Sequence, residues 1–228
     1  MKVLRRTLAA LLDLVYPPRC AACGAPAAPE PFCEICAGAV EPVPPGCSRC
    51  GLPGPDPVCG ACLAEPPAFA SVRAGALFGG PVADAVHALK YANRPALARP
   101  LGSWLASRAR LPDGAAVVAV PLSRGRRVAR GYDQAALLAD ALARAAGAPR
   151  LRAALRRTRE TPPQVGRTRG ERARNVQGAF AAAPSARDRD LVLVDDVVTT
   201  GATVRAAAEA LARAGARSVT VVALARAE

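Results

Sequence analysis

The chain has 228 residues, of which 51% are hydrophobic, and a formal net charge of +13. This length suits one core domain plus a smaller module, and the apolar content is ample for a core. No run approaches 18 uninterrupted apolar residues, which excludes a membrane span on the usual criterion. Residues 1–71 hold five basic and six acidic side chains, so the positive charge belongs to residues 72–228. Nearly all of it is arginine among abundant alanine, which weakens charge alone as evidence for a polyanion partner.

Residues 1–18 begin with basic residues before an apolar run, as a signal peptide does. Asp13 interrupts that run, however, and Leu4, Leu8 and Val15 recur at helical spacing. We therefore predict an amphipathic helix that ends at the two prolines. In the absence of an export signal we expect a cytoplasmic protein.

Residues 19–63 hold four Cys-x-x-Cys pairs and predict a double zinc ribbon. Each pair places two thiolates on one turn, and two pairs complete a tetrahedral four-thiolate site. A segment this short and rich in Pro and Gly buries little apolar surface, so the metal must supply folding energy. Sequential pairing is the simplest topology, and crossed pairing stays open. The expected ligands of two structural zinc ions are Cys20, Cys23, Cys33, Cys36, Cys47, Cys50, Cys59 and Cys62.

The alternatives for these cysteines are a disulfide framework and a redox Cys-x-x-Cys centre. The missing export signal argues against disulfides. Fourfold repetition without a βαβ context argues against a redox centre. Residues 64–71 read as a linker to the larger domain.

Residues 72–228 alternate apolar strand runs with helical patterns, which predicts an α/β domain. Strands are expected at 72–78 and 115–120, and helices at 81–91, 95–108 and 133–146. His87, the only histidine, and Trp104, the only tryptophan, lie in two of these helices. We interpret His87 as a surface or packing residue, and Trp104 as a core residue rather than a platform for ligand stacking.

A basic, glycine-containing loop follows the strand at 115–120. Such a loop at the carboxyl edge of a sheet is where α/β folds bind polyanions, although a solvated charge run is the plainer alternative. A second arginine-rich segment spans 150–174. The candidate pyrophosphate or DNA ligands in the two segments are Ser123, Arg124, Arg126, Arg127, Arg130, Arg159 and Arg172.

The most informative stretch reads LVLVDDVVTTGAT, from Leu191 to Thr203. Four apolar residues predict a buried parallel strand, which two acids follow directly. A Thr-Thr-Gly turn then leads into an alanine-rich helix whose free backbone N–H groups and dipole favour an anion. The two acids suit the vicinal hydroxyls of a sugar that carries a phosphate at its other end.

This stretch resembles, at every position, the phosphoribosyl pyrophosphate (PRPP) motif of type I phosphoribosyltransferases. A receiver-like strand that ends on two acids by chance is the plainer alternative, and the ordered tail of threonines and glycine disfavours it. No Gly-Lys-Ser/Thr follows, so the turn is not a P-loop.

The rest of the chain resembles the ComF family, which combines a cysteine-rich zinc module with a phosphoribosyltransferase-like domain. The matching segments are Leu89–Tyr91, Pro121-Leu122 with Arg130–Ala135, Arg159-x-Thr161-x-x-Gln164, and Arg172-x-x-Asn175-x-x-Gly178-Ala179-Phe180. Two departures are Asp133, where the family has Asn, and Asn93, where Gly is frequent. Asp133 adds a negative charge beside the expected pyrophosphate loop.

The resemblance implies a PRPP site that works with Mg²⁺. Asp195 and Asp196 would engage the ribose hydroxyls as catalytic residues, and the basic loop would face pyrophosphate. The 5′-phosphate would lie against Val197, Val198, Thr199, Thr200, Gly201, Ala202 and Thr203.

Two accounts of function follow. In the first, the chain is a phosphoribosyltransferase that acts on PRPP. In the second, it is a non-catalytic PRPP sensor or nucleic-acid-binding adaptor. The resemblance implies a role in DNA uptake during natural competence, with single-stranded DNA and a helicase as partners, although a phosphoribosyltransferase outside competence remains an alternative. Aromatic residues make up only 4% of the chain, so contacts to the DNA backbone would have to dominate.

Overall fold

The computed structural model describes residues 18–27, 30–160 and 175–227. The predicted helix at 1–18 lies outside the described residues except for its last position. Residues 161–174, which make up most of the arginine-rich segment 150–174 and include Arg172, also lie outside the described residues. Among the described residues, no helix is long and apolar enough to cross a membrane.

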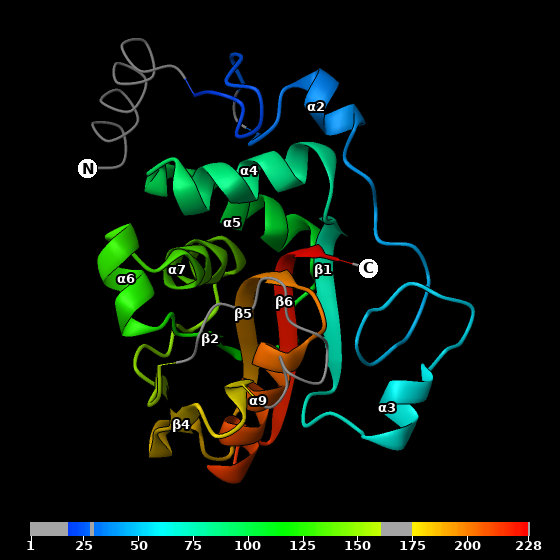
Figure 1. Cartoon of the computed structure of the whole chain (residues 1–228), viewed down its shortest axis with the longest axis vertical. Coiled ribbons are helices and arrows are strands. Elements are labelled where there is room, and N and C mark those ends of the chain that lie inside the picture. Colours follow the sequence, from blue (N-terminus) through cyan, green and yellow to red (C-terminus); the bar gives the residue numbers. More distant parts are fainter. Residues whose placement is uncertain (1–17, 28–29, 161–174, 228) are drawn as a thin grey trace.

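The core is a four-stranded, fully parallel sheet in the order β1-β6-β5-β2 (Figure 1). Its strands are β1 (Ser71–Leu77), β2 (Ala116–Ala119), β5 (Asp190–Val198) and β6 (Ser218–Arg226). The two central strands, β5 and β6, are almost completely buried, because helices cover both faces of the sheet. The predicted α/β parallel sheet is confirmed.

Alternate residues of each strand face two different helix layers. Val117, Val192 and Leu224 pack with α4 (Gly80–Tyr91), α5 (Ala98–Arg108) and α7 (Gln134–Ala146). Val118 and Leu193 pack instead with α9 (Ala202–Arg213). The period-2 alternation of a strand therefore decides which layer each residue of β5 meets, including its two acids.

A small antiparallel hairpin, β3 (Leu155–Arg157) with β4 (Phe180–Ala182), lies beside α9. The part of the chain that the structure describes also contains two short 3₁₀ helices, η1 (Pro95–Leu97), before α5, and η2 (Pro184–Ala186), after β4. The sequence pattern indicated only that the chain returns toward the sheet after Asn175, and it did not predict the hairpin.

The cysteine-rich segment packs against the core at two places. Its first half carries α2 (Glu34–Gly38) and packs Phe32 edge-on against Trp104 of α5, with ring centroids 5.6 Å apart. Its second half carries α3 (Gly60–Ala64) and lies beside β1, where the Val72 amide donates to the Arg49 carbonyl (Figure 1). Trp104 is buried in the core, as predicted.

The prediction of a loop after β2 is wrong in one respect, because residues 124–130 form a short helix, α6 (Arg124–Arg130). Apart from Gly125 and Val128, its residues are arginines and an alanine, which favour a helix. Ser123 stands at its N-cap position, and Gly131 ends it with a left-handed backbone at φ 81°.

Candidate functional site

The eight cysteines form two four-sulfur clusters that follow the sequential pairing. Within each cluster, all four sulfurs lie within 4.8 Å of one another. Four sulfurs about 2.3 Å from a tetrahedral zinc ion would stand about 3.8 Å apart. The Cys23–Cys33 and Cys50–Cys59 sulfurs are separated by 3.8 and 3.7 Å. Both clusters therefore fit zinc, and the crossed pairing is excluded.

The first cysteine of each cluster is prepared to bind metal. Burial opposes ionisation of Cys20 and Cys47, but backbone N–H groups near their sulfurs outweigh it and lower each pKa to about 6. A thiolate is the form that binds zinc, so these two sulfurs present the ligating form at neutral pH.

Elemental analysis of untagged protein should give about two zinc equivalents per chain, since two closed four-thiolate sites leave no cysteine over. Cys33→Ser should reduce the content to about one, because it opens only the first site. A single equivalent in well-folded wild-type protein would contradict the paired-ribbon arrangement.

The two acids at the end of β5 have different surroundings, because strand alternation turns them to opposite sides. Asp196 faces the layer of α4 and α7, is 4% exposed and has both oxygens engaged. Its Oδ1 lies 2.7 Å from the Lys90 Nζ, and its Oδ2 accepts a hydrogen bond from the Gln134 side chain at 2.8 Å. Asp196 is therefore an anchored buried anion.

Asp195 faces the other side of β5 and is only partly buried. One of its oxygens, Oδ1, accepts the Asp196 backbone N–H at 2.8 Å. With residues 197–204 it lines a small cavity of about 20 Å³ at the start of α9. A carboxylate in this position suits Mg²⁺, which binds through one or two carboxylates and the oxygens of a phosphorylated ligand. Of the two predicted acids, Asp195 is the one next to the phosphate loop.

We use "phosphate loop" for residues 197–203. Gly201 is the N-cap of α9, with φ 78°, a backbone conformation that side chains rarely adopt. The Ala202 N–H contacts the Thr200 hydroxyl at 3.4 Å. The loop follows the acids directly and leads to the first N–H groups of the 12-residue helix α9, as the sequence predicted.

Lys90 is a site residue to which sequence reasoning gave no role. It lies in the last turn of α4, with 19% of its side chain exposed, and pairs with Asp196 across about a hundred residues of sequence. Its place in the Leu89-Lys90-Tyr91 segment of the family pattern was the available signal.

The charge state of Asp195 makes stability depend on pH. The partial burial of Asp195, which removes water from its carboxyl group, and then the charge of neighbouring Asp196 raise its pKa to about 8. An unfolded aspartate titrates near about pH 3.9, so the folded protein binds more protons between these values. The free energy of unfolding of ligand-free protein should therefore fall as pH rises from about 4 to 8.

Asp195→Asn should remove this part of the pH dependence, because asparagine is neutral throughout. Urea denaturation of both proteins at about pH 5 and pH 8 measures this dependence. At pH 8 the free energy of unfolding of the variant should exceed that of the wild type by roughly 1 kcal/mol or more. Equal slopes against pH in the two proteins would show that Asp195 titrates normally.

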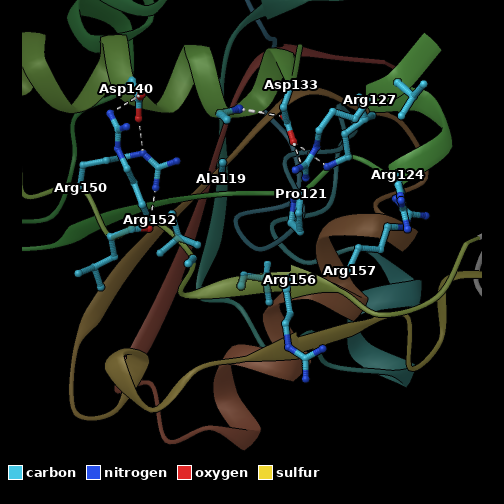
Figure 2. A pocket seen from close by; sticks show the side chains of 17 residues that line it. Ala119, Pro121, Arg124, Arg127, Asp133, Asp140, Arg150, Arg152, Arg156 and Arg157 are labelled. Atoms are coloured by element: carbon cyan, nitrogen blue, oxygen red, sulfur yellow. Dashed lines mark hydrogen bonds and ion pairs between the residues drawn. The ribbon is translucent and has the colours of Figure 1, made fainter. Parts of the chain in front are cut away.

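An arginine-lined cavity of about 750 Å³ lies between α6, α7 and β3 (Figure 2). At one end, Arg150 and Arg152 pair with Asp140 at 2.9 and 2.7 Å. Arg150 also donates to the Val117 carbonyl of β2. These two arginines therefore hold the chain after α7 against the sheet.

The opposite end of the cavity carries Arg124, Arg127, Arg156 and Arg157. Arg124, Arg127 and Arg156 are exposed, and among the described residues the one acid lining this end is Asp133, 3.8 Å from Arg127. Asp133 also caps α7 by accepting the Ala136 N–H, which explains how the chain tolerates an acid there. This end can attract an anion.

Glu160 shows that the start of α6 accepts an anionic group. The Gly125 N–H donates to its carboxylate at 3.2 Å. Desolvation works in the opposite direction, but hydrogen bonds from Gly125, Ser123 and the Arg124 backbone outweigh it and lower the pKa of Glu160. Ser123 is buried at this end of the helix.

The other residues singled out in the sequence lie outside this arginine-lined cavity. Arg126 and Arg130 line a second cavity, of about 610 Å³, together with Lys90 and the exposed Tyr91. Arg159 donates to the Asn175 and Gln177 carbonyls, so it joins the two ends of the 160–175 segment. His87 is exposed and its ring lies against Phe78 and Tyr91, as expected for a surface or packing residue.

Comparison with known proteins agrees with this architecture. A phosphoribosyl transferase domain model matches residues 91–228, and a double zinc ribbon domain model matches residues 11–65. A structure of the glutamine PRPP amidotransferase from B. subtilis, complexed with ADP and GMP, aligns with a TM-score of 0.41 and 24% identity. The alignment covers 56% of this chain and 26% of that one.

Two relatives match nearly the whole chain. The DNA utilization protein YhgH of Escherichia coli (strain K12) is 34% identical over 206 residues, which are 86% of this chain and 90% of that protein. Competence protein F of Haemophilus influenzae is 31% identical over 209 residues, covering 85% and 90%. With its double zinc ribbon followed by a phosphoribosyltransferase domain, the chain belongs to the ComF family.

Proposed function

We propose that the chain binds PRPP with Mg²⁺ at the end of β5, binds single-stranded DNA on its arginine-lined cavity, and acts in DNA uptake in the cytoplasm. The observation that carries the proposal is the continuous order of Asp195, the phosphate loop and the start of α9 around one small cavity. The names of the two relatives, one for DNA utilization and one for competence, support the cellular context.

In this proposal the 5′-phosphate accepts hydrogen bonds from the phosphate loop and the first N–H groups of α9. Asp195 would hold Mg²⁺ together with the oxygens of PRPP, and the ion would neutralise charge on the pyrophosphate. Asp196 would act indirectly, by holding Lys90 and the end of β5 in place.

The pyrophosphate would lie toward the start of α6, against Ser123, Arg124 and Arg127. Glu160 accepts the Gly125 N–H in the ligand-free structure. Because a pyrophosphate oxygen would use the same donor, we expect PRPP to displace the Glu160 carboxylate.

Phosphorus NMR of PRPP titrated with the protein tests the proposal, because the 5′-phosphate and the pyrophosphate give separate resonances. We expect the 5′-phosphate resonance to change with or without Mg²⁺, since the phosphate loop needs no metal. The pyrophosphate resonances should change mainly with Mg²⁺. Resonances unaffected under both conditions would refute the proposed site.

Turnover distinguishes the enzyme from the sensor. A transferase would release pyrophosphate when an acceptor attacks the ribose, with the protein positioning charge around the leaving group. Pyrophosphate release should be measured with nucleobases, nucleic acids and small amines as acceptors. PRPP binding without release across all of these would favour the sensor.

Binding of single-stranded DNA should depend strongly on salt. With at least three phosphate contacts, the slope of log affinity against log salt should exceed about 2 in magnitude, at roughly 0.7 per contact. The double variant Arg124→Gln/Arg127→Gln should lower the magnitude of this slope by about 1.4. Arg213→Gln, on α9, is the control. An affinity that does not depend on salt would contradict the DNA part of the proposal.

The expected protein partner is a helicase that acts on the same DNA strand.

A further inference from the structure

The second zinc ribbon, which contains Cys47, Cys50, Cys59 and Cys62, reaches the phosphate loop through a buried arginine. Arg226 stands at the end of β6 and is 4% exposed. Its Nε donates to the Cys50 carbonyl at 3.2 Å. Its Nη1 donates to the Val198 carbonyl at 3.0 Å and to the Thr199 carbonyl at 2.5 Å. One guanidinium therefore joins a zinc ligand to two consecutive residues of the loop.

These contacts fix how the loop presents its donors. A trans peptide is planar, so its C=O and N–H point in opposite directions. With the Val198 and Thr199 carbonyls turned toward Arg226, the N–H groups of Thr199 and Thr200 point away from it. The Ala227 N–H reinforces the arrangement by donating to the Val198 carbonyl at 2.9 Å. Arg226 thus sets the orientation of two N–H groups in the loop.

A second arginine connects the same ribbon to the helix that follows the loop. Arg205 lies in the first turn of α9, and its Nη2 donates to the Cys62 sulfur at 3.4 Å. Its Nη1 donates to the Glu65 carbonyl at 3.0 Å, and its guanidinium lies over the Phe69 ring. A hydrogen bond to a thiolate ligand orients the ligand and tunes its hold on zinc.

The first ribbon has a different neighbourhood. Cys20 and Phe32 belong to the buried cluster of α4 and α5, whereas Cys47, Cys50 and Cys62 belong to the cluster of α9. The two zinc sites are therefore attached to opposite layers of the sheet.

We infer that Arg226 and Arg205 are positioning residues that couple zinc in the second ribbon to the ligand on the phosphate loop, so that each stabilises the other. The inference rests on the proposed binding of PRPP at this loop. Coupling between two sites is reciprocal. Zinc in the second ribbon should strengthen PRPP binding, and PRPP should slow zinc release from that ribbon.

The test measures the release of zinc from the full-length, zinc-bound protein to a chromogenic chelator, with and without PRPP and Mg²⁺. Because the chelator also binds Mg²⁺ weakly, enough Mg²⁺ is used to saturate this weak binding. Release should occur in two phases, and Cys33→Ser, which retains only the second site, identifies the phase from that ribbon. PRPP should slow this phase roughly tenfold and leave the other unchanged.

Arg226→Lys keeps the charge but cannot reach the ribbon and both loop carbonyls at once. It should weaken PRPP binding about tenfold and abolish the effect of PRPP on zinc release. Arg205→Ala removes the contact with the Cys62 sulfur from a partly exposed position, so it keeps the test informative if the Arg226 variant misfolds. Arg213→Ala, which loses only an exposed pair with Glu209, is the matched control and should behave as wild type.

The inference is overturned if Arg226→Lys and Arg205→Ala hold two zinc ions, bind PRPP like wild type and show the same slowing. It is also overturned if PRPP binds the wild type but slows both phases equally or neither. If PRPP does not bind the wild type, the proposed function is contradicted, and so is this inference, because it rests on that function.

Discussion

Replacing Gly201 by valine is expected to abolish PRPP binding while the protein stays folded. Gly201 has φ 78°, and a β-branched residue there costs about 1–2 kcal/mol in backbone strain. Apart from its two neighbours in the chain, a Cβ at this position would meet no atom closer than the Val204 Cγ2 at 4.0 Å, so packing does not oppose it. The loop would relieve the strain by turning its N–H groups, and affinity should fall by about 100-fold or more.

The matched control is Gly147→Val. Gly147 ends α7 with φ 66°, a Cβ added to it would meet no protein atom within 4 Å, and it lies away from the phosphate loop. It carries comparable strain, so both variants should lose similar stability in urea denaturation, and only Gly201→Val should lose PRPP. Wild-type affinity in Gly201→Val would show that the loop does not hold the phosphate.

Asp195→Asn should remove the Mg²⁺ dependence of PRPP binding. Asp195 lines the cavity of the phosphate loop, and in the proposed site its negative charge would hold the cation. Affinity with Mg²⁺ should drop about tenfold or more, to the value without it. Ribose 5-phosphate, which lacks the pyrophosphate, should bind wild type and variant alike.

Asp196→Asn should have a different effect, namely a loss of protein stability. Both Asp196 oxygens accept hydrogen bonds, from Lys90 and Gln134, and an asparagine NH₂ would face one of these donors. Stability should fall by about 1–3 kcal/mol, and the loss should shrink when Lys90→Met is added. If instead Asp196→Asn loses the Mg²⁺ dependence and Asp195→Asn keeps it, the assignment of the two acids is reversed.

Local sequence patterns predicted much of the fold. The apolar run before Asp195, the acid pair and the threonine-glycine turn each indicated one feature, and the structure joins them as β5, its end and the start of α9. The spacing of the cysteines predicted two metal sites for the same reason, because the ligands of each site lie close in sequence.

Long-range contacts could not be predicted in this way. The pairing of Lys90 with Asp196 depends on α4 and β5 meeting in space, and the contact of Arg226 with Cys50 spans 176 residues. The different surroundings of the two acids could nevertheless have been predicted, since adjacent residues of a strand face opposite sides. The helix at 124–130 was hidden by its charge, which favoured a loop.

Calorimetric titration of the zinc-bound wild-type protein with PRPP, with and without Mg²⁺, tests the central claim most directly. The account predicts saturable binding at one site per chain, with higher affinity when Mg²⁺ is present. Absence of binding under both conditions, also with single-stranded DNA added, would contradict it.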